Sequence, residues 1–200
     1  MLHWYIPDGE SPAALNEDHI RSTIKGLEVI QEQGGGLMGF VQSYRSLLSV
    51  PRPDKSIVSV QKLLEKVHVL MDQENRDGTV HFTIVTDPMD LELFIDEKQI
   101  SQILVNLGKN ALQSLKGQEK GHIHIMGGTN DKGKKYIRIT DNGPGIPPDL
   151  MDEIFIPFFT TKNTGTGIGL SLSKQIMHLH GGTIKVHSLP YKETSFILSF

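Results

Sequence analysis

The stretch from Thr140 to Ser171 decides how the chain is organised. It reads Thr140-Asp-Asn-Gly-Pro-Gly-Ile-Pro147, then Ile154-Phe-Ile-Pro-Phe-Phe-Thr-Thr-Lys162, then Gly165-Thr-Gly-Ile-Gly-Leu-Ser171. Glycine leaves no side chain between the backbone and a ligand, and a helix that begins beside glycine presents bare N–H groups to anions. An acid in one glycine-rich turn and an anion cradle in another indicate a ligand with a polar ring and a phosphate tail. The stretch therefore predicts a nucleotide pocket.

Hydrophobic periodicity places helices and strands around this stretch. Helices are predicted at residues 13–50, 60–71, 97–115 and 170–179, and strands at 57–60, 80–86, 91–95, 122–127, 135–140, 183–188 and 195–200. Because most expected strand pairs are neighbours in the sequence, we expect a two-layer α/β (α+β) sandwich. Its mixed, mainly antiparallel sheet of about five strands would be covered by three helices and preceded by an N-terminal helical segment.

The N-terminal segment has the apolar stripe of an amphipathic helix, interrupted by three glycines. Gly34-Gly35-Gly36 should cost up to about 1 kcal/mol per residue relative to alanine, yet we expect one continuous helix that is weak there. Pro51-Arg52-Pro53 then ends the helix, because proline removes a backbone donor and fixes the chain. The predicted domains are a helical segment at 1–50, a linker at 51–56 and a main domain at 57–200.

The composition limits the classes of function. The 200 residues are 38% hydrophobic and 22% charged, the net charge is −3, and cysteine is absent. These values fit a globular protein without thiolate chemistry and give no general attraction to nucleic acid. No apolar run approaches the roughly 18–20 residues that a membrane helix needs. We therefore expect no nucleic-acid partner and no membrane segment in this chain.

Asn106, Lys109 and Asn110 are candidates for binding a metal and phosphate. The two asparagines lie four residues apart, on one face of a predicted helix. Their amide oxygens can hold Mg²⁺, which keeps most of its waters and bridges phosphate oxygens, and the lysine can meet a phosphate as a point charge. Asn-x-x-x-Asn alone also fits a plain solvated helix face.

Asp141 is the candidate for recognising the ring. It ends an apolar strand, where its carboxylate can accept a hydrogen bond from an exocyclic amine such as adenine N6. Gly143 and Gly145 let the backbone turn under the ring, and Ile146 can form the floor. In isolation, the same residues also fit a simple Asp-Asn-Gly turn.

The polar segment 160–164 has the composition of a lid, between aromatic residues on one side and glycines on the other. Phe155, Phe158 and Phe159 would be either a hinge patch at its base or ordinary core. Glycine-rich turns precede many helices, so Gly165-Thr-Gly-Ile-Gly169 alone is weak evidence. The order and spacing of all these features carry the specificity.

Together, these motifs resemble the catalytic ATP-binding domain of sensor histidine kinases, within the wider family of gyrase, Hsp90 and MutL. Asn106-Leu-Gly-Lys-Asn110 resembles the asparagine box, and Asp141-Asn-Gly-Pro-Gly-Ile146 the first glycine box. Phe155-Ile-Pro-Phe-Phe-Thr-Thr-Lys162 resembles the phenylalanine box, and Gly165-Thr-Gly-Ile-Gly-Leu170 the second glycine box. The resemblance extends over residues 57–200.

The resemblance implies ATP and Mg²⁺ as cofactors. Asn110 would be the metal ligand, and Asn106, Lys109 and Lys162 would be catalytic residues at the phosphates. Asp141 would read adenine, with Ser195 joining through a shared water. The implied nucleotide-binding residues are Asn106, Asn110, Asp141, Gly143, Gly145, Ile146, Phe158, Thr160, Thr161, Lys162, Gly165, Thr166, Gly167, Ile168, Gly169, Leu170 and Ser195.

Asn106 separates the branches of this family. The ATP-hydrolysing members have a glutamate four residues before the metal-binding asparagine, as the base for water, and Asn106 cannot take up a proton. The resemblance therefore favours a histidine kinase over an ATPase. A Ser/Thr kinase of the same fold, and a pseudo-enzyme or assembly module that binds nucleotide, remain alternatives.

The histidine that would accept the phosphate is not found. His19 has Thr23 four residues on, but Ile20 and Ile24 stand where the resemblance requires an acid and a proline. Residues 21–51 resemble instead the second helix of the dimerisation hairpin in kinases similar to nitrogen-regulation sensors. The resemblance thus implies a cytoplasmic catalytic fragment whose partners are a histidine-bearing helix, a second copy in the parent homodimer and a response regulator. It leaves open whether the parent protein is membrane-anchored.

Overall fold

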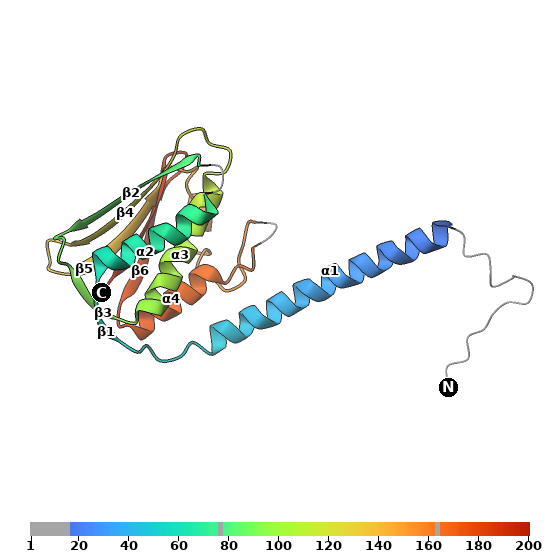
Figure 1. The fold of residues 1–200 in the computed structure, drawn as a ribbon, viewed down its shortest axis with the longest axis horizontal. Helices are drawn as coiled ribbons and strands as arrows, with labels where there is room; N and C mark the ends of the chain where they lie inside the picture. The colour runs from blue at the N-terminus through green and yellow to red at the C-terminus, as the bar shows by residue number, and fades with distance from the viewer. Residues whose placement is uncertain (1–16, 76–77, 163–164) are drawn as a thin grey trace, which may run out of the picture. The chain divides into compact units, whose positions relative to one another are not determined.

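The computed structural model describes residues 17–75, 78–162 and 165–200. Contacts divide the chain into two compact units, with the division between Gln42 and Ser43. Figure 1 traces the elements along the chain. The division lies within the first helix, so the domain boundary expected at the linker 51–56 remains a prediction.

Helix α1 (Glu17–Leu48) is one uninterrupted helix through Gly34-Gly35-Gly36. The continuity expected from the sequence is confirmed, and residues 13–16 of the expected helix lie outside the described residues. Its large apolar side chains are exposed to solvent by 46–70% of their surface: Ile20, Ile24, Leu27, Val29, Ile30, Leu37, Met38, Val41 and Tyr44. Apart from Tyr44, whose ring stacks on that of Phe158 with the centroids 6.4 Å apart, these side chains give the helix a stripe of exposed apolar surface.

The second unit is built on a five-stranded mixed sheet with the order β2-β4-β5-β7-β6. The strands are β2 (Val80–Asp87), β4 (Gly121–Thr129), β5 (Lys135–Asp141), β6 (Thr183–Leu189) and β7 (Glu193–Ser199). Strands β2 and β4 pair in parallel, and every other pair in this sheet is antiparallel. Strands β1 (Ser56–Ser59) and β3 (Glu92–Ile95) form a separate antiparallel pair. The expected mixed, mainly antiparallel sheet is confirmed.

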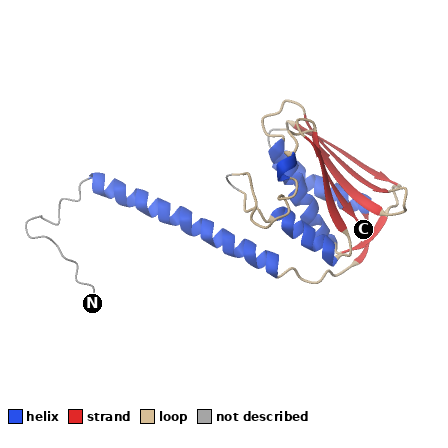
Figure 2. Ribbon diagram, turned by 180° about the vertical axis from the view of Figure 1, so that it is seen from behind, coloured by secondary structure: helices blue, strands red, loops and turns tan. Residues whose placement is uncertain are grey.

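Three helices cover one face of the sheet: α2 (Val60–Glu74), α3 (Glu97–Ser114) and α4 (Gly169–Leu179). A short 3-10 helix, η1 (Pro148–Leu150), lies between β5 and α4 in the sequence. Figure 2 shows the helices on one side and the strands on the other, as expected for a two-layer sandwich. Helix α3 packs against both α2 and α4, and so it is the central helix of the layer.

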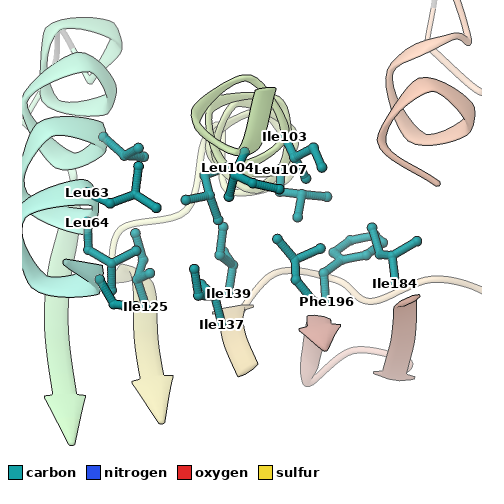
Figure 3. Packing of buried hydrophobic residues seen from close by; sticks show 14 of the residues in the cluster. Leu63, Leu64, Ile103, Leu104, Leu107, Ile125, Ile137, Ile139, Ile184 and Phe196 are labelled. Carbon is teal, nitrogen blue, oxygen red and sulfur yellow. The ribbon is translucent and has the colours of Figure 1, made fainter. Parts of the chain in front are cut away.

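The core lies between the central helix and the sheet. Ile103, Leu104 and Leu107 of α3 are almost fully buried, and they face Ile125 and Ile139 of the sheet. Figure 3 shows these side chains meeting between the helix and the strands. Each fully buried side chain of this size contributes about 1.5–3 kcal/mol through the hydrophobic effect. The burial fixes the rotation of α3, and with it the face that carries Asn106 and Asn110.

The N-terminus of α3 is capped by Asp96. The Asp96 carboxylate accepts hydrogen bonds from Lys98 N and Gln99 N at 3.0 and 3.1 Å, and from Asp54 N at 3.0 Å. Burial acts to raise the pKa of Asp96, but these three N–H donors outweigh it and hold the pKa below its usual value. Asp96 therefore stabilises the helix start while ionised.

The linker is hydrogen-bonded to the helical layer. Besides the bond from Asp54, the side chain of Gln99 donates to Pro51 O at 3.0 Å, and Lys55 Nζ donates to His180 O at 2.9 Å. The His180 ring in turn accepts from Asp96 N at 3.1 Å. The linker is thus held by both α3 and α4.

Asp96→Ala is expected to lower the free energy of unfolding by about 0.5–2 kcal/mol, the usual cost of losing an N-cap. The pKa of Asp96 is lowered in the folded state. Its contribution to the free energy of unfolding is therefore fully present above the pKa of the unfolded state and declines as the pH falls below about 4. Urea unfolding at pH 7 and pH 3 measures both effects. Asp72→Ala, an exposed acid on α2, is the control and should change stability by less than about 0.5 kcal/mol. Equal losses for the two variants would contradict the capping role.

Candidate functional site

One cavity of about 510 Å³ brings the sequence-predicted segments together. It lies among α3, the end of β5, the turn that follows it, the loop before α4 and strand β7. The lining residues are Asn106, Lys109, Asn110, Ala111, Gln113, Ser114, Asp141, Pro144, Gly145, Ile146, Pro147, Leu150, Ile154, Phe159, Thr160, Thr161, Lys162, Gly165, Thr166, Gly167, Gly169, Leu170, Thr194 and Phe196. Its volume is typical of sites for small molecules and cofactors.

Asp141 is the buried acid of the cavity, with 5% of its surface exposed. Its Oδ1 accepts a hydrogen bond from Gly143 N at 3.0 Å and another from Ser114 Oγ at 3.1 Å. Burial raises the pKa of Asp141, while the two hydrogen bonds and the charge of Lys162 act in the opposite direction. Among the described residues no donor is assigned to Oδ2, so this oxygen is available to a ligand.

The two asparagines of α3 both line the cavity, but they have different partners. Asn106 Nδ2 donates to Ser173 Oγ of α4 at 3.2 Å, and Asn110 Oδ1 accepts from Lys162 Nζ at 3.3 Å. A Cβ added to Gly169 would collide with the Asn106 amide, so glycine permits the close approach of α3 and α4. Asn106 therefore links α3 to α4, and the Asn110 oxygen accepts a hydrogen bond from the positively charged ammonium group of Lys162.

Two lysines are placed at the cavity. Lys162 Nζ donates to Gln113 Oε1 at 2.6 Å, and partial burial lowers the pKa of Lys162, with the charge of Asp141 acting in the opposite direction. Lys109 lies at the cavity wall, but its ammonium group forms an exposed ion pair with Glu74 at 2.9 Å. Lys162 is thus the lysine that points into the site, and the role of Lys109 at the phosphates remains a prediction.

The segment before α4 is shaped by one tight backbone contact. Phe158 N donates to Gly167 O at 2.9 Å, and both residues have positive φ, 70° and 67°. A Cβ on Gly167 would collide with the Phe158 carbonyl group. Residues 163 and 164 of the predicted lid lie outside the described residues. Within the described part, Thr160, Thr161 and Lys162 line the cavity, as expected.

Helix α4 begins at Gly169, beside the cavity, and no side chain caps its start. The first turn of a helix has N–H groups without intrahelical partners, and the helix dipole is positive there. Gly165 and Gly167 lie on the same wall of the cavity. The predicted anion cradle is therefore placed where it can act on a ligand in the cavity.

Four predicted binding residues do not line the cavity: Gly143, Phe158, Ile168 and Ser195. Ile168 is buried, and Gly143 acts through its N–H on Asp141. The placement of Ser195 is a correction, because its Oγ is 3.0 Å from Thr140 Oγ1 on the other face of the sheet. Alternate residues of a strand face opposite sides, so Thr194, the register partner of Asp141, lines the cavity instead.

Sequence reasoning missed Gln113 and Ser114, which line the cavity and contact Lys162 and Asp141. They follow Asn110 by three and four residues, and so they lie on the same helical face. That spacing could have found them. Apolar wall residues such as Phe159 and Phe196 carry no comparable signal, because their composition equally fits ordinary core.

Comparison with known proteins identifies the class. The model of the family described as histidine kinase-, DNA gyrase B-, and HSP90-like ATPases matches residues 95–200. The chain belongs to this family. The asparagine, aspartate and glycine-rich segments that surround the cavity all lie within the matched region.

Individual relatives are sensor histidine kinases. The chain is 37% identical over 172 residues to the sensory histidine kinase/phosphatase NtrB of Vibrio alginolyticus, an alignment that covers 81% of this chain and 48% of the relative. The chain therefore spans about half the length of such curated relatives. Within the described ranges, no helix is long and apolar enough to cross a membrane.

Solved structures have the same fold. The catalytic domain of histidine kinase ThkA is 33% identical, with a TM-score of 0.66, covering 74% of this chain and 95% of that one. ThkA in complex with the response regulator protein TrrA is 26% identical, with a TM-score of 0.70, covering 97% of this chain and 53% of that one. The fold is thus the ATP-binding catalytic fold of sensor histidine kinases.

Proposed function

We propose that this chain binds Mg²⁺·ATP in the cavity and transfers the γ-phosphoryl group to a histidine on a helix outside the chain. The observation that carries the proposal is the buried Asp141, whose Oδ2 is available in a cavity that also adjoins the uncapped start of α4. The carboxylate fits an amino-bearing ring, and the helix start fits a phosphate tail. Their presence in one cavity supports a nucleotide site there.

The residues present fit the adenine end of ATP. An ionised carboxylate is an acceptor only, and so it pairs with an exocyclic N–H. Ile146 and Phe196 provide apolar walls, and Gly145 lines the same region without a side chain. Phosphates at the other end would meet the N–H groups of α4 and the ammonium group of Lys162.

The residues present also fit Mg²⁺, which takes oxygen ligands and keeps several waters. The described residues hold no group of three or more His, Cys, Asp or Glu side chains that could bind a metal. A Mg²⁺ site whose ligands are the Asn110 oxygen, waters and phosphates needs no such group of side chains. The Asn110 oxygen already accepts a hydrogen bond from Lys162 Nζ at 3.3 Å. Mg²⁺ would neutralise charge on the phosphates during transfer.

The cavity supports transfer to a protein rather than to water. Asp141 is the only acid among the described lining residues, and its carboxylate is assigned to the ring. Asn106, in the position where a hydrolase of the family has its base, cannot take up a proton and is bonded to Ser173. In the proposed step, an imidazole nitrogen forms a bond to Pγ, the bond between Pγ and the β–γ bridging oxygen breaks, and ADP leaves.

The proposed partners follow from α1 and from the relatives. The exposed apolar stripe of α1 supports packing with a histidine-bearing helix and with a second copy in the parent protein. The relatives are sensor histidine kinases, and ThkA is known in complex with a response regulator. We propose that a response-regulator aspartate then receives the phosphoryl group. We also propose a cytoplasmic site of action, where ATP is present.

The test is to supply the histidine helix separately. The chain is mixed with an NtrB-type hairpin that carries the histidine box and with ATP labelled on the γ-phosphate, with and without Mg²⁺. Label is expected on the hairpin only with Mg²⁺, and it should be lost in acid but kept in alkali, as a phosphorus–nitrogen bond is. Acid-stable label would favour the Ser/Thr kinase, and ATP binding without transfer would favour the assembly module.

Asn110→Ala is expected to abolish the gain in ATP affinity that Mg²⁺ gives the unchanged chain, because the proposed protein ligand of the metal is lost. Calorimetric titration of ATP in Mg²⁺ and in EDTA measures this gain. Gln102→Ala, an exposed residue on the same helix, is the matched control and should keep it. An undiminished gain in Asn110→Ala would remove Asn110 from the metal site.

A further inference from the structure

We propose that Ser114 is a positioning residue that holds the Asp141 carboxylate ready for an amino-bearing base, and so sets a preference for adenine over a 6-oxopurine. The proposal rests on the proposed function, because it assumes that Asp141 faces the ring of a bound nucleotide. It goes further by assigning base specificity to a pair of residues, one on α3 and one on β5.

The geometry gives the Ser114 hydroxyl two acceptors. Its Oγ is 2.8 Å from Ala111 O, one turn earlier in α3, and 3.1 Å from Asp141 Oδ1. A hydroxyl group has one proton, so it donates to one of the two at a time. An ionised carboxylate is the stronger acceptor. The proton is therefore directed to Asp141 when Asp141 is charged, and it returns to the helix carbonyl when Asp141 is neutral.

Both protein donors reach the same oxygen of Asp141. Gly143 N and Ser114 Oγ bind Oδ1, and no donor among the described residues is assigned to Oδ2. A Cβ on Gly143 would lie 2.6 Å from Oδ1 and 2.7 Å from Ser114 Oγ, so these three residues are packed without spare room. The carboxylate plane is fixed, and Oδ2 is left for the ligand.

This arrangement selects between amino and oxo groups. Oδ2 of an ionised carboxylate accepts a hydrogen bond from an amino group and repels an oxo group, which is also an acceptor. A protonated carboxyl group can donate to an oxo group, so the selection fails once Asp141 is neutral. Ser114 stabilises the ionised form by donating to it, and it therefore supports the selection as well as the geometry.

The direction of the pH effect follows from the groups around Asp141. Burial raises the pKa of Asp141, and Gly143, Ser114 and the charge of Lys162 act in the opposite direction. Lys162 is the charged group that acts on this carboxylate among the described residues. Removing the Ser114 hydroxyl removes one of the groups that offset the effect of burial on the pKa of Asp141. The pKa of Asp141 therefore rises in the variant. When the pH is lowered, the variant loses its selectivity for ATP at a higher pH than the unchanged chain does.

The experiment titrates ATP and inosine triphosphate, whose ring has an oxo group in place of the amine, into the full chain between pH 5 and 8. Ser114→Ala is expected to reduce the ATP-to-inosine triphosphate preference by about tenfold, the size of one hydrogen bond to a charged group. It should also move the midpoint of the pH profile upward. Ser101→Ala is the matched control, because Ser101 is on the same helix and its buried hydroxyl has no partner among the described residues.

Ser114→Thr and Ser114→Val form a second matched pair, of the same shape but differing in the hydroxyl. The threonine variant should keep the preference for ATP and the midpoint of the pH profile. The valine variant should lose the preference and shift the midpoint upward. This pair tests the proposal even if the alanine variant fails to fold. An unchanged preference and midpoint in Ser114→Ala would overturn the proposal, and so would an equal loss of both nucleotides with an unchanged midpoint. Absence of ATP binding by the unchanged chain would instead overturn the proposed function.

Discussion

Asp141→Asn is expected to weaken ATP binding by about 10- to 100-fold and to raise the melting temperature of the ligand-free chain at neutral pH. The first effect follows because a hydrogen bond to a charged acceptor is worth about 1.5–3 kcal/mol. The asparagine amide keeps the size of the side chain but replaces one acceptor oxygen with a donor. Calorimetric titration measures the affinity, and thermal unfolding measures the stability.

The rise in stability follows from the raised pKa of Asp141. The folded chain holds this proton more tightly than the unfolded chain, so stability decreases as the pH rises from the unfolded to the folded pKa. At neutral pH the buried charge therefore opposes folding, and a neutral side chain removes that cost. The difference between the variant and the unchanged chain should shrink at acidic pH.

Asp131→Asn is the control, because Asp131 is an exposed acid in the turn between β4 and β5. It should change neither ATP affinity nor stability beyond about 0.5 kcal/mol. A destabilised Asp141→Asn variant would mean that the carboxylate supports the fold. A fully retained affinity for ATP would remove Asp141 from the ring site.

Gly167→Ala is expected to destabilise the chain by about 2–5 kcal/mol and to abolish ATP binding. Positive φ costs an alanine about 1–2 kcal/mol, and overpacking costs about 1–3 kcal/mol more. The added methyl would lie 2.6 Å from Phe158 O and 2.7 Å from Phe159 O, which are backbone atoms that cannot turn aside. The segment before α4 must shift, and with it the cavity wall. Urea unfolding and ATP titration measure the two losses.

Gly133→Ala separates the two causes. Gly133 also has positive φ, 74°, but a Cβ there meets no atom within 4 Å. This variant should show only the backbone cost of about 1–2 kcal/mol and should keep full ATP affinity. If the two variants behaved alike, the contact between Gly167 and Phe158 would not shape the site.

The sequence predicts the elements better than the pairing of the strands. Alternation marks a strand but does not name its partner, so the parallel pairing of β2 with β4 and the separate pair β1–β3 could not be read from it. The Asp96 cap was predictable because capping is local. The continuity of α1 through Gly34-Gly35-Gly36 was predictable from its periodicity.

For the site, the sequence predicts the residues that carry a motif and misses those that support them. Asp141, Asn110 and Lys162 meet at one cavity as expected. Ser195 was misplaced because one residue of error in a strand reverses the face of the sheet. The spacing of Ser114 after Asn110 places it on the same helical face, but its contact with Asp141 appears only when β5 is packed beside α3.

The hydrogen bonds of the linker limit the length of free chain between the end of α1 and the catalytic unit. Helix α1 ends at Leu48, and Pro51 O is already held by Gln99, so only two residues lie between them. Three peptide units extend at most roughly 11 Å. The chain therefore has little free length between the end of α1 and the first residue of the linker that is hydrogen-bonded to α3. A catalytic unit trimmed to begin at Ser56 would lose these anchors, whereas one that begins at Pro51 would keep them.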